Sequence, residues 1–333
     1  MIGSRAGARA SAIVAAVIGL AAATAVVGYF NFSAVLASMR PIGVGGFLVV
    51  MAAQVALFIP LGLAWWLVAL EDARQAPAFI WGRLLREAAA DVLPFSQLGG
   101  IVVAARAVVL GGVSPAVAFG SSVVDITIEI VAQLIYTLLG VALLAHRLGL
   151  GAGGNPLVLA LLGGVAIGAT VAGGMVATQT RGMRLLEGLI GRLVPSAAGG
   201  ANAVTAALEG AHGRPRRLWV CLGLHLGSWF GSAVGTWLIL DFIDHPLPFL
   251  SVVAIESLLF AIRNAAFMVP SGLGVQEGAY ALVGPLFGLP AEAALALSLL
   301  KRARDIAVGV PMLLSWQILE TRRSIRRGRC GPD

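Results

Sequence analysis

Two short stretches decide the predicted fold: Leu93-Pro94-Phe95-Ser96-Gln97-Leu98-Gly99-Gly100 and Val269-Pro270-Ser271-Gly272-Leu273-Gly274-Val275. They interrupt two apolar regions, about 79–110 and about 249–287, near the middle with proline and glycine. The apolar halves on either side are too short to cross a bilayer, since a spanning helix needs about 20 residues. Each region is therefore predicted to be a re-entrant hairpin of two half-helices, which enters and leaves the membrane on the same face.

The rest of the chain has the composition of a membrane protein. Of its 333 residues, 59% are hydrophobic and 12% are charged, and the mean hydropathy is +0.92. A soluble domain carries about 25% charged residues, so this composition excludes a water-soluble enzyme. Six apolar stretches have the length of a membrane span, at roughly 11–30, 45–70, 116–145, 157–178, 218–241 and 291–317.

The two broken regions indicate an internal repeat. A shift of 176 residues places Pro94 on Pro270, and it also places Gly112 on Gly288, Asp125 on Lys301 and Glu129 on Asp305. Each half then contains three spans and one hairpin, and because three is an odd number the second half must be inverted. The predicted fold is an all-α polytopic membrane protein with two inverted repeats. Inverted repeats whose broken helices meet near the midplane are typical of transporters.

The predicted domains are a first repeat at 1–150, a second repeat at 151–320 and a basic tail at 321–333. The formal net charge is +7, and 22 of the 23 basic residues are arginine. Most arginines lie in segments that the predicted topology places on one face, including Arg74, Arg83, Arg86 and the connector at 181–217. By the positive-inside rule that face is cytoplasmic, and so are both termini. The connector is either an amphipathic surface helix or a solvated basic loop.

Ionisable residues inside the apolar stretches carry most of the functional information. If all nine faced lipid, at about 3 kcal/mol each, the cost would be roughly 25 kcal/mol, which exceeds the roughly 5–15 kcal/mol stability of a folded protein. We therefore expect them to line a polar cavity between the two halves. The alternative is a set of internal ion pairs, such as Asp125 or Glu129 with Lys301 or Arg304. The nine are Arg106, Asp125, Glu129, Glu256, Arg263, Glu277, Lys301, Arg304 and Asp305.

The breaks add backbone groups to this predicted cavity. A half-helix that begins near the midplane directs free N–H groups and a partial positive charge inward. With Arg106, Arg263 and Lys301 it would suit an anionic group such as a lipid phosphate, whereas a merely kinked helix would bind nothing. The acidic residues would balance the charge and carry protons. Besides the nine charges, the predicted site contains Pro94, Gln97, Gly99, Gly100, Asn264, Pro270, Gly272 and Gly274.

Sequence motifs of other chemistries are missing. The sequence has no GxxxxGK[ST] phosphate loop, no HExxH and no GxSxG, which disfavours the enzyme classes that use them. Its two cysteines and four dispersed histidines form no ligand pattern, so we expect neither a metal nor another cofactor. His225 is interpreted as a hydrogen-bonded packing residue.

The two breaks resemble a known pair of signatures. Leu93–Gly100 followed by Arg106, and Val269–Gly274 followed by Glu277, are similar to the flippase-like family related to the transmembrane domain of lysylphosphatidylglycerol synthase. The first stretch also resembles the branch called hopanoid-biosynthesis-associated membrane protein. The resemblance covers nearly the whole chain and implies a bacterial inner-membrane protein that moves an amphiphile, in that branch a hopanoid, between leaflets. Lipid aminoacylation is not expected, because no soluble aminoacyl-transfer domain follows the second repeat.

Three functions fit these observations. The favoured one is a flippase that moves a polar-headed lipid, either a hopanoid or an anionic phospholipid, and that is not an enzyme. The second is an intramembrane enzyme that modifies a lipid headgroup with Glu277 or Asp125 as the base. The third is a non-transporting scaffold that recruits hopanoid-biosynthesis enzymes through the basic connector. No nucleic-acid partner is expected, and the sequence leaves open both a homo-oligomer and an association with those enzymes.

Overall fold

The computed structural model describes residues 33, 37, 39–92, 96–149, 159, 163, 213–266, 269 and 272–329, although not the side chains of 96–98 and 322–329. The predicted spans at 11–30 and 157–178 and nearly all of the predicted connector lie outside these residues. Every secondary-structure element in the described part of the chain is a helix. The all-α prediction is confirmed for these residues.

Three long helices have the length and composition needed to cross a membrane: α3 (Gly43–Ala69) with the preceding turn η1 (Arg40–Ile42), α6 (Pro115–Arg147) and α9 (Pro215–Phe242). They occupy three of the six predicted spans, which confirms a multi-pass membrane protein. Local sequence sets the start of α6, since the Ser114 hydroxyl accepts a hydrogen bond from the Val117 N–H at 3.3 Å. Proline at the first position of a helix fits the same pattern.

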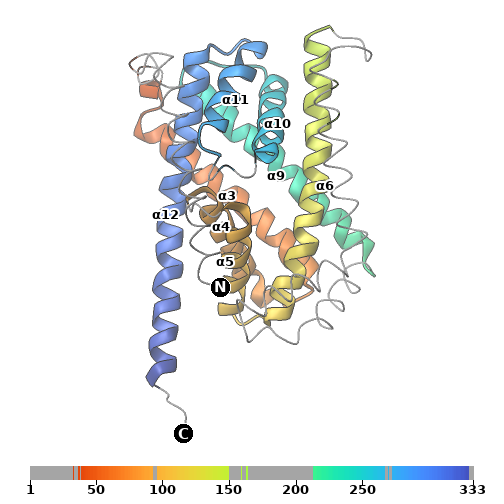
Figure 1. The fold of residues 1–333 in the computed structure, drawn as a ribbon, viewed down its shortest axis with the longest axis vertical. Coiled ribbons are helices and arrows are strands. Elements are labelled where there is room, and N and C mark those ends of the chain that lie inside the picture. Colours follow the sequence, from red (N-terminus) through yellow and green to blue (C-terminus); the bar gives the residue numbers. More distant parts are fainter. Residues whose placement is uncertain are drawn as a thin grey trace, which may run out of the picture.

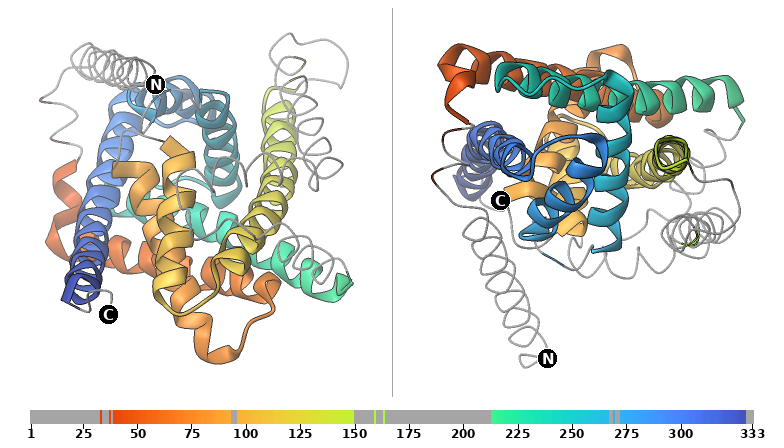
Figure 2. Two further views of the ribbon diagram at one scale, coloured as in Figure 1. Left: turned by 60° about the horizontal axis from the view of Figure 1, so that its bottom comes forward. Right: turned by 90° about the horizontal axis from the view of Figure 1, so that it is seen from above.

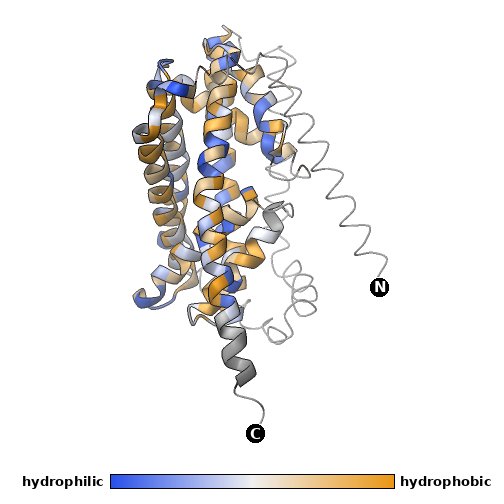
Figure 3. Ribbon diagram, turned by 90° about the vertical axis from the view of Figure 1, so that its left-hand side faces the viewer, coloured by the Kyte–Doolittle hydropathy of each residue, from blue (hydrophilic) through white to orange (hydrophobic). Residues whose placement is uncertain are grey.

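The helix α12 (Ala291–Arg329) covers the last predicted span and continues beyond it. It is not among the three helices above, because Lys301, Arg302, Arg304 and Asp305 fall within five residues of its sequence. Figure 3 shows hydrophilic residues interrupting this helix between hydrophobic stretches. Lys301 and Arg304 are each only 4% exposed, so these two charges face the interior of the protein.

Both broken regions form pairs of helices. In the first, η2 (Ala73–Gln75) leads into α4 (Ala76–Val92), and α5 (Ser96–Leu110) follows the break. In the second, α10 (Phe249–Ala265) is followed by α11 (Val275–Val283) and the short turn η5 (Gly284–Phe287). The helices therefore end and restart around the positions of Pro94 and Pro270, two residues that lie outside the described part of the chain.

Close packing within the first pair depends on a glycine. The helices α4 and α5 pack along each other, and a Cβ atom on Gly100 would lie 2.6 Å from the backbone oxygen of Arg86. A real Cβ atom cannot approach a carbonyl oxygen so closely. Gly100, which the sequence analysis places in the cavity, is therefore the position at which the two backbones of the pair approach each other.

The order of elements is the same in both halves, with α3, α4, α5 and α6 in the first and α9, α10, α11 and α12 in the second. In Figure 1 the α4–α5 pair lies in the lower half of the molecule and the α10–α11 pair in the upper half, with α12 on one side and α6 on the other. The helices α3 and α9 pack side by side along one face, as Figure 2 shows from above.

Each pair of short helices packs into a separate apolar cluster. One cluster joins α3, α4, α5, α6 and the first part of α9 around Trp65 and Phe79, whose rings meet edge to face with centroids 5.2 Å apart. The other joins α9, α10, α11 and α12 with parts of α3 and α6, around residues such as Leu258 and Tyr280. The two pairs of short helices are thus anchored separately, and the polar residues described below lie where the halves meet.

Candidate functional site

A cavity of about 330 Å³ takes part of its wall from both broken hairpins. Asp91 near the end of α4 and Ile101 of α5 come from the first, and Arg263 of α10 and Gly272 after the second break come from the other. The long helices α3, α6, α9 and α12 complete the wall. Its charged residues are Arg83, Arg86, Glu87, Asp91, Glu129, Arg263, Lys301, Arg304 and Asp305.

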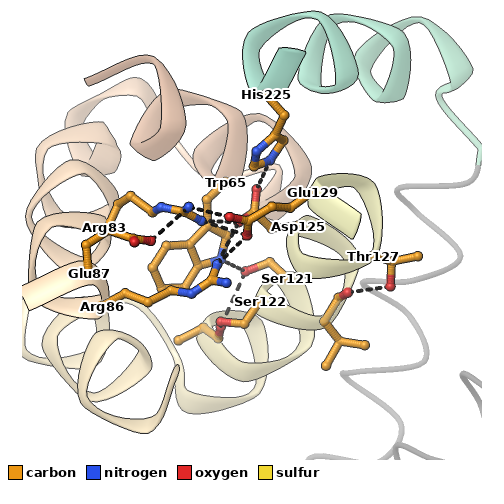
Figure 4. Close-up of polar contacts among 12 residues, drawn as sticks. Trp65, Arg83, Arg86, Glu87, Ser121, Ser122, Asp125, Thr127, Glu129 and His225 are labelled. Atoms are coloured by element: carbon orange, nitrogen blue, oxygen red, sulfur yellow. Dashed lines mark hydrogen bonds and ion pairs between the residues drawn. The ribbon is translucent and has the colours of Figure 1, made fainter. Parts of the chain in front are cut away.

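On one side of the cavity, two arginines of α4 meet carboxylates of α6 (Figure 4). Arg83 donates two hydrogen bonds to Glu129, at 3.0 and 2.6 Å, and pairs with Glu87 one turn along α4 at 2.9 Å. Arg86 pairs with the same Glu129 at 2.8 Å. The Arg83 side chain is 2% exposed. Two parallel bonds between a guanidinium and a carboxylate fix both groups in orientation, so this part of the wall is rigid.

Asp125 stands behind this pair and joins it to α9. Its carboxylate lies 3.5 Å from Arg83 and 3.7 Å from Arg86, and its other oxygen lies 3.0 Å from Nε2 of His225. Both His225 and Asp125 are buried. A chain of contacts therefore runs from α4 through α6 to α9, and His225 is hydrogen-bonded, as predicted from the sequence.

Across the cavity, α10 and α12 form a second buried pair. Lys301 donates to Glu256 at 2.6 Å and to the Thr236 hydroxyl of α9 at 3.1 Å. The Tyr280 hydroxyl of α11 donates to the other oxygen of Glu256 at 2.5 Å. Glu256 is fully buried at 0% exposure, and only Lys301 of this group reaches the cavity wall. The lysine is also 5.9 Å from the ring centroid of Phe260.

A third set of charges lies near the two breaks. Arg263, close to the end of α10, reaches Asp91 near the end of α4 at 3.3 Å. This pair directly joins the two hairpins. Arg304 pairs with its neighbour Asp305 at 2.7 Å. The Arg263 and Asp91 side chains are 20% and 28% exposed, so this bridge is the more accessible part of the charged wall.

The remaining wall is largely apolar. It includes Leu57 and Phe58 of α3, Ile126 of α6 and Trp229 of α9. Trp229 meets the ring of Phe260 edge to face with centroids 4.5 Å apart. A cavity with a charged part and an aliphatic and aromatic part is suited to an amphiphile, because the polar and apolar parts of one molecule find separate surroundings.

The structure brings seven of the predicted site residues into this wall and two more directly behind it. The carboxylates of Asp125 and Glu256 stand behind the wall, in contact with Arg83 and Lys301. The residues in the wall itself are Glu129, Arg263, Asn264, Gly272, Lys301, Arg304 and Asp305.

Other predicted site residues lie elsewhere. Glu277 accepts a hydrogen bond from the Gly274 N–H at 2.9 Å and pairs with Arg302 at 2.8 Å, so it caps the start of α11. Arg106 pairs with Glu320 of α12 at 2.7 Å. Neither they nor Gly99 and Gly100 are in the cavity wall. Pro94, Pro270 and the side chain of Gln97 lie outside the described residues.

One expectation from the sequence is wrong. Arg83 and Arg86 do not lie in a cytoplasmic loop but are buried in α4, 2% and 8% exposed, because the carboxylates of α6 and Glu87 compensate their charge. Asp125 and Glu129 do form internal ion pairs, as the alternative to an open polar cavity supposes, but with these arginines and not with Lys301 or Arg304. The spacing of Arg83, Arg86 and Glu87 at i, i+3 and i+4 places all three on one helix face, and this signal could have revealed the charged side of α4.

Asp125, Cys221 and His225 are the group in the described residues whose positions could hold a metal ion. One ligand atom from each lies within 4.8 Å of the others, and all three residues are buried. The Asp125 carboxylate is, however, already engaged by His225 and two arginines. These contacts account for the geometry without an ion, so no metal chemistry is assigned to the group.

The comparison with protein families agrees with this architecture. A family model described as "Lysylphosphatidylglycerol synthase TM region" matches residues 11–312, which include both hairpins and every residue of the cavity wall. The chain belongs to this family. No curated protein and no solved structure matches it. As a member of the lysylphosphatidylglycerol synthase TM family, it is a membrane protein related to lipid handling, and the resemblance inferred from the two breaks is confirmed at that level.

Proposed function

We propose that this member of the lysylphosphatidylglycerol synthase TM family moves a polar-headed lipid between the leaflets of the bacterial inner membrane. The observation that carries the proposal is one cavity with nine charged residues in its wall, built from both broken hairpins of a multi-pass membrane protein. A charged side chain inside the hydrocarbon core of a membrane is costly unless it pairs with an opposite charge or faces a polar space. A lipid headgroup is the polar group that a membrane supplies in quantity.

Alternating exposure of this cavity is part of the proposal. The two halves are inverted repeats and the helix pairs are re-entrant, with both termini in the cytoplasm. The shared element order and the meeting of Asp91 and Arg263 across the two hairpins support this scheme. A shift of one hairpin against the other would open the cavity to one leaflet at a time, as in other transporters built from inverted repeats.

The cargo is an amphiphile with a polar headgroup, and a hopanoid is the candidate suggested by the Pro-Phe-Ser-Gln-Leu-Gly-Gly stretch beginning at Pro94. The headgroup lies against the charged residues, and the hydrocarbon part lies along Leu57, Phe58 and Trp229. The lipid leaves chemically unchanged, since the proposed activity is movement and not modification.

The proposal is tested with purified protein in phosphatidylcholine vesicles that contain a trace of tail-labelled phosphatidylglycerol or a labelled hopanoid. A membrane-impermeant quencher then reports how fast the label changes leaflet. Arg263→Gln removes a partly exposed cation of the wall, and losing a charge-assisted hydrogen bond of about 1.5–3 kcal/mol lowers the rate about ten- to a hundredfold. Arg302→Gln is the matched control, because Arg302 belongs to α12 but not to the cavity wall.

Three outcomes would overturn the proposal. If Arg263→Gln and Arg302→Gln move lipid at the same rate as the unmodified protein, the cavity is not the pathway. If lipids recovered from the vesicles or from a deletion strain show a change of mass, the protein is a headgroup-modifying enzyme. If no lipid moves in vesicles while the deletion still disturbs lipid biosynthesis in cells, the protein is a scaffold.

A further inference from the structure

The ion pair between Lys301 and Glu256 has one member in the cavity wall and one sealed behind it. Lys301 lines the cavity, while Glu256 is 0% exposed and receives hydrogen bonds from Lys301 and Tyr280. We propose that this pair couples the lipid to a proton. An anionic headgroup draws Lys301 away from Glu256, and Glu256 then takes up one proton from water. This inference rests on the proposed function and adds its energy source and the charge of its cargo.

The charges around the second hairpin make proton uptake necessary. Arg263 pairs with Asp91, Arg304 with Asp305 and Lys301 with Glu256, so each cation has one carboxylate. Near the first hairpin, Arg83 and Arg86 face the three carboxylates Glu87, Asp125 and Glu129. The site holds no spare positive charge among its described residues. An arriving phosphate or carboxylate therefore adds one negative charge that no cation of the site compensates, and a proton removes that added charge.

Glu256 is the carboxylate that we expect to take the proton. The side chains of Asp91 and Asp305 are 28% and 14% exposed, so both are more accessible than that of Glu256. Glu256 is fully buried and Lys301 is its one direct cationic partner in the described residues. Burial favours the neutral form of a carboxyl group once its cation is withdrawn.

The surroundings of Glu256 contain groups from four helices. Tyr136 of α6, Tyr280 of α11 and Lys301 of α12 interact with Glu256 itself. Around these groups, Arg263 of α10 and Arg304 of α12 lie near Tyr280, and Arg304 and Asp305 of α12 lie near Lys301. Tyr280 can continue to donate to Oε1 when Glu256 is neutral, and the proton binds Oε2, where Lys301 donates now. Of the two hydrogen bonds that Glu256 accepts, the exchange breaks only the one between Nζ and Oε2. When the headgroup leaves, Lys301 returns to Glu256 and the proton is released.

This scheme determines the net charge that crosses the membrane with each lipid. One headgroup of charge −1 travels with one proton, so transport is electroneutral and responds to a pH difference but not to a membrane potential. The anion accumulates in the leaflet that faces the more alkaline solution. With one proton per lipid, a pH difference of one unit gives about a tenfold leaflet ratio at steady state.

The test uses the full-length protein in phosphatidylcholine vesicles with a trace of tail-labelled phosphatidylglycerol and a pH difference of one unit. The leaflet ratio is measured with an impermeant quencher after the label stops redistributing, so it does not depend on the rate or on the orientation of the protein. We expect about tenfold enrichment toward the alkaline side. A potassium diffusion potential set with valinomycin should leave this ratio unchanged.

Two variants test whether Glu256 is the residue that binds the proton. Glu256→Gln carries a neutral amide in place of the carboxyl group, so lipid still moves but the ratio falls to one. Glu277→Gln is the matched control. Like Glu256, Glu277 is buried and paired with a cation of α12, but it lies away from the cavity wall. The Glu277→Gln variant should therefore keep the tenfold ratio.

The outcomes separate this inference from the proposed function. If the unmodified protein moves the lipid but the ratio ignores pH or follows the potential, coupling is overturned and the flippase stands. If neither labelled phosphatidylglycerol nor the labelled hopanoid of the first assay moves, both fail. If only the hopanoid moves, the flippase stands and coupling to an anionic headgroup is overturned. If Glu256→Gln keeps the pH response, Glu256 is not the proton carrier. If that variant does not fold, the ratio measured with the unmodified protein still decides whether one proton accompanies each lipid.

Discussion

At the residue scale, Arg83 is held by more carboxylates than any other cation among the described residues. Its buried guanidinium contacts Glu87, Asp125 and Glu129, and it binds Glu129 through two hydrogen bonds. Removing one partner of such a group leaves the other charges uncompensated, which costs much more than the net value of the pair. Arg83 is therefore expected to stabilise the contact between α4 and α6 whatever the cavity binds.

The first prediction follows from this network. Arg83→Gln should lower the free energy of unfolding by about 3–5 kcal/mol, the cost of breaking a buried ion pair. Thermal unfolding of the purified protein in detergent measures the change. Arg106→Gln is the control, because its pair with Glu320 is about one-third exposed and should be worth at most about 1 kcal/mol. Equal losses for the two variants would contradict the central position of Arg83.

Single residues also show which features of the charged site can be predicted from the sequence. It correctly indicates that charges such as Glu129, Arg263 and Lys301 gather, because their cost in lipid makes any other arrangement unfavourable. It cannot indicate which cation meets which carboxylate. Partner choice depends on how far each helix rotates and slides, and the nearest cation to Glu129 proves to be on α4, in a segment that resembles a basic loop.

At the element scale, the breaks were the most predictable feature and the charged pairs the least. Proline and glycine end helices by local rules, so the pairs α4–α5 and α10–α11 fall where the sequence places them. In each half, the first helix of the hairpin forms an ion pair with the following long helix, but the acidic and basic partners are exchanged between the halves. Asp125 and Lys301 occupy the same place after the shift of 176 residues, yet the first meets an arginine of α4 and the second a glutamate of α10.

Exchanged charges of this kind would hide the predicted repeat from a search for identities. The two halves can make the same contact between the first arm of a hairpin and the following long helix while sharing no residue at either position. A comparison of hydropathy detects the shared element order, because it depends on the position of apolar stretches and breaks. This explains why the order of elements was predictable and the matching of individual residues was not.

The second prediction concerns the packing of the first hairpin. Gly100→Ala would place a Cβ atom 2.6 Å from the backbone oxygen of Arg86 and force α4 and α5 apart, at a cost of about 1–3 kcal/mol. Gly227→Ala in α9 is the control, since nothing lies within 4 Å of its added Cβ atom. Alanine favours a helix over glycine, so this variant should be neutral or more stable by up to about 1 kcal/mol. Thermal unfolding in detergent distinguishes the two.

At the scale of the whole molecule, the proposed function depends on relative movement of the two hairpins. Each packs into a separate apolar cluster, and the direct ionic contact between the hairpins in the described residues is the partly exposed pair of Asp91 and Arg263. A partly exposed ion pair contributes little to stability and can break and re-form readily. This ionic contact is therefore a weak link between the hairpins at the point where the proposed transporter must open.

The last prediction tests this movement. In a Cys221→Ser, Cys330→Ser background, Asp91→Cys with Arg263→Cys places one thiol near the end of each hairpin. A short bis-maleimide is used, because side chains that meet tip to tip leave their backbones too far apart for a disulfide. Cross-linking should lower lipid movement in vesicles at least about tenfold relative to the same variant before cross-linking, since a lipid too large for the closed cavity has to pass between the hairpins. Trp237→Cys with Leu247→Cys, two residues in contact within one half, should cross-link without this loss. An equal rate before and after cross-linking at 91 and 263 would show that the hairpins need not separate.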